Sequence, residues 1–139
     1  MITVVIIGLL VALAIPVFQR IHQEARINAF INDMRIIYYG VESFALQSGD
    51  YPDATSGALP PELEGYIRGA FFASETPLGG SWSILHDPAD TIVSAVGAVG
   101  VDPELIDEVD ERIDDGDASS GQIRQISGGL FWIVREESN

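Results

Sequence analysis

The chain has 139 residues, a formal net charge of −14 and no cysteine, and this length allows one compact domain besides any membrane segment. The negative charge argues against binding of a nucleic-acid backbone by the bulk surface, because attraction to phosphate requires a basic surface. The absence of cysteine excludes disulfides and thiolate metal sites.

The first 18 residues contain no charged side chain, and the first ionic residue is Arg20. As a helix this run is about 27 Å long, close to the ~30 Å hydrocarbon core of a bilayer. Pro16 removes a backbone hydrogen bond, and Gly8 is a weak helix former. We predict an apolar helix that enters a membrane and loosens between Gly8 and Pro16. A cleaved signal peptide is disfavoured, because no basic residue precedes the apolar run.

From Ile21 onward the apolar residues recur at helical spacing, which predicts an amphipathic continuation of the same helix. One helix is expected from Ile2 to about Gln47, with Gly49 as a left-handed C-terminal cap. The side expected to face the rest of the protein consists of Ile27, Phe30, Met34, Ile37, Val41 and Phe44.

The predicted organisation has three parts, which are a membrane or filament-core helix half (1–19), an amphipathic helix half (20–48) and a globular head (49–139). Within the head, Asp102 is a good N-cap with Pro103 at the first helical position. The expected elements are a short helix at 61–67, strands at 82–85 and 91–99, a helix at 104–113, and a terminal hairpin of strands 122–127 and 129–135. The fold class is therefore α+β, with the long helix packed on a small antiparallel sheet.

Two segments resemble a known superfamily. The run from Val4 to Pro16 (VVIIGLLVALAIP) resembles the N-terminal segment of type IV pilins and type II secretion pseudopilins, which typically continues Ile-Gly-x-Leu-Ala-x-x-Ala-Ile-Pro. The tetrapeptide Gly49-Asp50-Tyr51-Pro52 is similar to the Gly-x-Tyr-Pro that follows the long helix in many pseudopilins. The resemblance implies a pilin-like fold, with a long helix that carries a small sheet.

One feature departs from that superfamily. Its apolar segment normally opens with Phe-Thr-Leu-Ile-Glu after a short basic leader, whereas this sequence begins at Met1 inside the segment. We therefore expect a start codon placed too late or a fragment. The leader, the methylated N-terminal residue and the assembly glutamate would then lie upstream of Met1.

The resemblance implies a non-enzymatic structural subunit of a type IV pilus-like or pseudopilus filament. Such a subunit waits in the inner membrane as a single-pass protein with its head outside the cytoplasm, and assembles into a cell-surface or periplasmic filament. The implied partners are further copies of the chain, minor pilins, and an assembly platform with its ATPase. Gly8 and Pro16 would mark helix melting on assembly. The filament core would be packed by Val4, Ile7, Leu10, Val11, Ile15 and Phe18.

Alternatives remain open at this level. The filament could be an extended pilus or a short secretion pseudopilus, and the chain a major or a minor subunit. A single-pass, membrane-anchored, non-catalytic binding domain is the second interpretation. An enzyme is not expected, because His22 and His86 are the only histidines and the first lies on the long helix. No acid–base pair with a positioned partner is therefore evident in the sequence.

An acidic segment suggests a cation site. Residues 102–117 hold nine of the 21 acidic residues, and clustered oxygen ligands suit calcium. Some major pseudopilins that resemble this chain hold calcium in C-terminal loops, and the candidate ligands here are Asp114, Asp115 and Asp117. The spacing does not fit an EF-hand. The alternative is a solvated helix face followed by a turn, without a cofactor.

Overall fold

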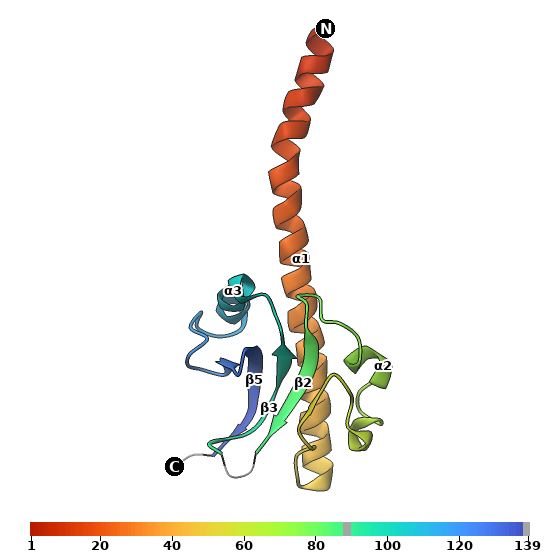
Figure 1. Cartoon of the computed structure of the whole chain (residues 1–139), viewed down its shortest axis with the longest axis vertical. Coiled ribbons are helices and arrows are strands. Elements are labelled where there is room, and N and C mark those ends of the chain that lie inside the picture. Colours follow the sequence, from red (N-terminus) through yellow and green to blue (C-terminus); the bar gives the residue numbers. More distant parts are fainter. Residues whose placement is uncertain (88–89, 138–139) are drawn as a thin grey trace.

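A computed structural model of the chain describes residues 1–87 and 90–137. Its dominant element is α1 (Ile2–Ser48), a single helix that ends at Gly49 in the left-handed conformation (φ 81°). Its 47 residues correspond to about 70 Å of helix. In Figure 1 the first half of α1 stands clear of the rest of the chain, and the head folds against the second half.

The head contains a five-stranded sheet in the order β1-β2-β3-β5-β4, and every pairing is antiparallel. The predicted α+β class, a long N-terminal helix with a small antiparallel sheet, is therefore confirmed. The strands are β1 (Thr55–Ser56), β2 (Ser81–His86), β3 (Ile92–Val99), β4 (Ile123–Ile126) and β5 (Gly129–Glu136).

Helix α1 packs on this sheet through the amphipathic stripe. Ile27, Phe30, Met34, Ile37 and Val41 are buried, whereas Phe44 is half-buried and meets Tyr66 edge to face, with ring centroids 5.8 Å apart. Phe30 stacks on Trp82 of β2 at 5.3 Å between ring centroids. Burial of each large apolar side chain contributes roughly 1.5–3 kcal/mol, so this face of α1 is a main source of head stability.

The segment after α1 differs from the prediction in two places. The expected helix at 61–67 is instead a single 3-10 turn, η1 (Pro61–Leu63), followed by a separate short helix, α2 (Gly69–Phe72). Glycines at 65 and 69 disfavour a continuous helix here. The two-residue strand β1 lies in a segment for which no strand was predicted, and it pairs with Ser83 and Ile84 of β2.

The remaining helix, α3 (Pro103–Ile113), connects β3 to β4. It begins as predicted at Asp102, whose side chain accepts a hydrogen bond from the backbone N–H of Glu104 at 3.1 Å. Leu105, Ile106 and Val109 are buried in the core. Figure 1 shows α3 close to the point where α1 leaves the head.

Candidate functional site

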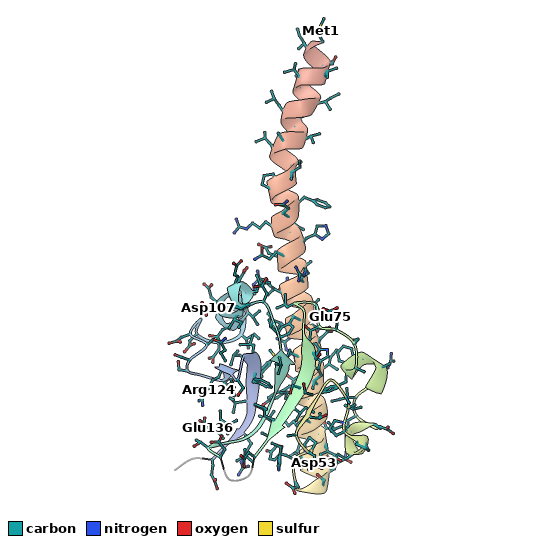
Figure 2. The ribbon with its side chains drawn as sticks, viewed as in Figure 1. Met1, Asp53, Glu75, Asp107, Arg124 and Glu136 are labelled. Carbon is teal, nitrogen blue, oxygen red and sulfur yellow. The ribbon has the colours of Figure 1, made fainter. Side chains whose placement is uncertain are left out.

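The apolar half of α1 carries most of the large hydrophobic side chains that are exposed among the described residues. Among the described residues, one helix is long and apolar enough to cross a membrane, and its most apolar stretch is not buried by the head. The side chains project from the ribbon with no other element beside them (Figure 2). Those predicted to pack a filament core are each between 52% and 71% exposed, namely Val4, Ile7, Leu10, Val11, Ile15 and Phe18.

Gly8 and Pro16 both lie inside this exposed helix. Although Pro16 interrupts the hydrogen-bond ladder, α1 continues through it, so the isolated chain keeps the segment helical. A Cβ atom built on Gly8 has no neighbouring atom within 4 Å. The structure therefore supplies no packing reason for glycine at position 8.

Polar contacts mark where the head begins to cover α1. Gln23 donates a side-chain hydrogen bond to Glu108 of α3 at 3.1 Å. Three residues later, the Arg26 guanidinium donates to the carbonyl of Pro77 at 2.9 Å. Arg112 of α3 donates to the Asn28 side chain at 2.7 Å. All three of these contacts between α1 and the head therefore lie at or after Gln23.

A second exposed apolar feature continues along the amphipathic half, and the sequence analysis missed it. It comprises Ile21, Ile36, Tyr39 and Leu46, which are between 48% and 82% exposed. At 100° per residue these four positions and Phe18 fall within about 80° of one another around the helix, on the side opposite the buried stripe. We call this set, with Phe18, the outer strip. The available signal in the sequence was a second group of apolar positions on the helical wheel, opposite the buried stripe.

The acidic segment forms the other candidate site, at the C-terminal end of α3. One carboxylate oxygen from each of Asp110, Asp114 and Asp115 lies within 4.8 Å of those of the other two. Asp110 is fully buried, whereas Asp114 and Asp115 are exposed. Asp110 and Asp114 share one side of the helix end because they are four residues apart.

Local hydrogen bonds hold this loop in shape. The Asp114 carboxylate accepts from the backbone N–H groups of Gln122 and Ile123, the latter at 3.3 Å, and so ties the end of α3 to the start of β4. Asp115 accepts from the N–H of Asp117 at 2.9 Å. Gly121 permits the close approach of Asp114 to the backbone of Gln122, because a Cβ atom at position 121 would lie 2.0 Å from the Asp114 carboxylate.

Burial of Asp110 changes its ionisation. Desolvation, followed by the neighbouring Asp115 carboxyl and the charge of Asp114, raises the pKa of Asp110 to about 6, while the Gly116 amide opposes the shift. When both groups are ionised, Asp110 and Asp115 offer only acceptors to each other. By strict geometry neither carboxylate oxygen of Asp110 has a hydrogen-bond partner among the described residues, so the nearby Gly116 N–H offsets the cost of burial only in part.

The three acids brought together differ from the predicted ligand set by one residue. Asp117, which we predicted together with Asp114 and Asp115, is not part of the trio and instead accepts hydrogen bonds from Ser119. Asp110 was missed because we assigned it to a solvated helix face. Its position four residues after Ile106 and three before Ile113 places it on the apolar side of α3, which was the available signal.

Comparison of the chain with protein-family models, with curated proteins and with solved structures finds no match in any of the three. The resemblance to pilins therefore continues to depend on the two segments quoted from the sequence.

Proposed function

We propose that the chain is a structural subunit of a filament of the type IV pilus or type II secretion pseudopilus kind. In this proposal α1 anchors the subunit in the inner membrane, with its head outside the cytoplasm, and then packs against α1 of neighbouring copies. The head coats the outside of the filament. The resemblance of the Val4–Pro16 segment supports this assignment, and so does the shape of a helix that extends far beyond its own head.

The observation that carries the proposal is the outer strip. A simple membrane anchor accounts for exposed apolar side chains up to Phe18. It does not account for Ile36, Tyr39 and Leu46, since Leu46 lies about 38 Å along the helix from Ile21. That distance exceeds the thickness of a hydrocarbon core. A neighbouring helix that follows α1 along its length covers both parts at once.

The energetics of such packing suit both environments. Within the membrane half, helix association replaces lipid contact and gains mainly from close packing. In the head half, covering Ile36, Tyr39 and Leu46 removes apolar surface from water, at roughly 25 cal/mol per Å². Assembly is thus favoured most where the subunit has left the bilayer.

Photo-crosslinking at Tyr39 tests the proposal. A photoreactive amino acid at Tyr39, in the full chain expressed in the cells that naturally make it, is expected to capture a second copy of the chain. The same group at the exposed Asp53, in the loop after α1 (Figure 2), serves as the control and is expected to capture far less. Membrane-inserted protein that yields no homodimer from Tyr39 would support the alternative, a membrane-anchored binding domain, and overturn the filament.

A further inference from the structure

We propose that a groove beside the outer strip docks the acidic outer side of α3 from a neighbouring copy of the chain whose α1 runs parallel. The groove has a volume of about 300 Å³ and is lined by Ile36, Tyr66, Ile67, Arg68 and Phe71. This inference rests on the proposed function, because it names the contact that sets how neighbouring subunits are placed around α1.

The groove continues the outer strip onto the head. Ile36 belongs to both features and is 48% exposed. Ile67 is buried, whereas Tyr66 and Phe71 are half-buried. A molecule that covers the outer strip of α1 therefore also meets the edge of the groove, where further apolar surface is removed from water.

Arg68 supplies the positive charge of the groove. Four of the seven arginines make an ion pair or a side-chain hydrogen bond within residues 1–87 and 90–137, namely Arg20, Arg26, Arg112 and Arg124. Of the other three, Arg68 is the one that lines this groove, and it is exposed. Each copy carries a net charge of −14, so two copies repel each other unless opposite charges meet at the contact. Arg68 is a cation at the edge of the apolar surface through which copies are proposed to pack.

The complementary surface is the outer side of α3. Glu104, Asp107 and Glu111 are exposed, and at 100° per residue they fall within about 60° of one another around the helix. The buried residues of α3 lie on its other side, and Figure 2 shows Asp107 on the side of α3 away from α1. The ion pairs found in the described part of the chain involve other acids. This row of carboxylates is therefore available to an arginine of another copy.

The groove and α3 lie on opposite flanks of the outer strip. Gly40, which packs against Ile67, is about 40° from Ile36 around α1. Asn28, which accepts a hydrogen bond from Arg112 of α3, is about 80° from Ile36 in the opposite sense. Figure 1 shows the same arrangement, with α2 and α3 on opposite sides of α1.

Parallel neighbours bring opposite flanks together. When two parallel helices pack along the same strip, the left flank of one lies beside the right flank of the other, as the e and g positions do in a parallel coiled coil. The groove of one copy thus faces α3 of the next. Such a head-to-tail contact repeats along an open filament instead of closing into a dimer. The opposite charges then select the relative placement of the copies more than they add affinity.

Cysteine crosslinking tests this geometry, because the chain has no cysteine of its own. The full chain carrying Arg68→Cys and Asp107→Cys is expressed in the cells that naturally make it and is treated with a short bis-maleimide reagent. A ladder of dimers, trimers and higher multimers is expected, since each copy joins one neighbour through each flank. Chains with Arg68→Cys alone or Asp107→Cys alone are expected to remain monomeric.

The matched control combines Arg135→Cys with Asp107→Cys. Arg135 is likewise an exposed arginine, but it lies in β5 and outside the groove. This pair is expected to give little or no ladder. Dimers from Arg68→Cys alone would mean that like flanks meet, and an equal ladder from the control would mean that the crosslinks are non-specific. Either result would overturn the proposal.

Charge reversal separates this contact from the filament itself, with the photo-crosslink from Tyr39 as the readout. Arg68→Glu is expected to lower the yield of that crosslink by about threefold or more, and Arg68→Glu/Asp107→Arg is expected to restore most of it. Arg135→Glu makes the same change of charge outside the groove and should leave the yield unchanged. A yield unaffected by Arg68→Glu would refute the groove contact and leave the proposed filament intact. Absence of the Tyr39 crosslink from the natural chain would refute both.

Discussion

Gly40 of α1 and Ile67 pack so closely that a Cβ atom on Gly40 would lie 2.5 Å from Cγ1 and 2.8 Å from Cδ1 of Ile67. Both residues are buried. Glycine is unfavourable inside a helix by about 1 kcal/mol relative to alanine, and here its small size allows the segment after η1 to approach the helix. The contact fixes where that segment lies along α1.

Gly40→Ala is expected to destabilise the head, since overpacking of about 1–3 kcal/mol exceeds the gain in helix propensity. Tryptophan fluorescence during chemical unfolding measures the change. Ile67→Ala should partly rescue it, so that the double variant loses less than the sum of the single losses. The control is Gly65→Ala, whose added Cβ has no neighbour within 4 Å. If the Gly40→Ala head were as stable as the Gly65→Ala head, the Ile67 side chain could move aside to accommodate the new methyl group without a cost in stability.

Met34→Asp is expected to unfold the head. Met34 is fully buried on the sheet side of α1, and a carboxylate there would lose its hydration without gaining a partner. The expected loss is several kcal/mol, comparable to the ~5–15 kcal/mol that keeps a domain folded. Asn32→Asp introduces the same group on an exposed position of the same helix and should leave the fluorescence melt nearly unchanged. The opposite ranking would mean that α1 presents another face to the sheet.

Gly121→Ala is expected to destabilise the head more than Gly128→Ala does. Both glycines have a positive φ, 80° at Gly121 and 78° at Gly128, so alanine is strained at either site. Only at Gly121 would the new Cβ also collide with the Asp114 carboxylate, whereas Gly128 has no neighbour within 4 Å. The difference between the thermal melts of the two variants measures how much of the loss at Gly121 comes from the collision. Equal losses would indicate that the loop between α3 and β4 adjusts freely.

The contribution of the Arg124–Glu136 pair is expected to disappear in acid. Arg124 donates two hydrogen bonds to Glu136, at 2.8 and 3.2 Å, and joins β4 to β5 (Figure 2). These bonds hold the pKa of Glu136 below its usual 4.5. A lowered folded-state pKa stabilises the fold above pH 4.5, and that contribution is lost as pH falls through the folded-state value.

The Tm of Glu136→Gln should therefore lie below that of the natural chain at pH 7, and the difference should vanish near pH 3. Because the pair is exposed, the difference is expected to be small. Glu137→Gln is a suitable comparison, since Glu137 adjoins the pair. A Tm difference for Glu136→Gln that persists unchanged at pH 3 would show that packing, and not charge, is responsible.

The Gly8→Ala/Pro16→Ala variant is expected to insert into membranes normally and to assemble poorly. The two substitutions strengthen the helix, because they remove residues that weaken it by about 1 and about 3 kcal/mol. Opening the 8–16 stretch on assembly would lengthen the chain, from ~1.5 Å per residue in a helix to about 3.3 Å when extended. The measurements are membrane fractionation and electron microscopy of filaments. Filaments with unbroken helical density from Ile6 to Ile21 would contradict the melting.

Much of the fold followed from local patterns. The helical spacing of apolar residues predicted α1 and its buried stripe, and the Asp102-Pro103 pair predicted the start of α3. Short runs typical of strands, one of them rich in β-branched residues, predicted the four longer strands. Each of these signals depends on residues that are close together in the sequence. Strand β1 could not be predicted, because a two-residue strand exists only through its pairing with β2. The separation of η1 from α2 likewise depends on how the segment lies against α1.

The sequence by itself determined the long helix, its division into an apolar and an amphipathic half, and the acidity of residues 102–117. These depend on periodicity and composition, which are properties of the chain alone. Only the tertiary structure decided which carboxylates of this segment lie close together. The burial of Asp110 and the approach of the Gly121 backbone to the Asp114 carboxylate depend on how α3 packs against α1 and the sheet. The tertiary structure also decided that Ile36, Tyr39 and Leu46 remain exposed, because their exposure depends on which face of α1 the head covers.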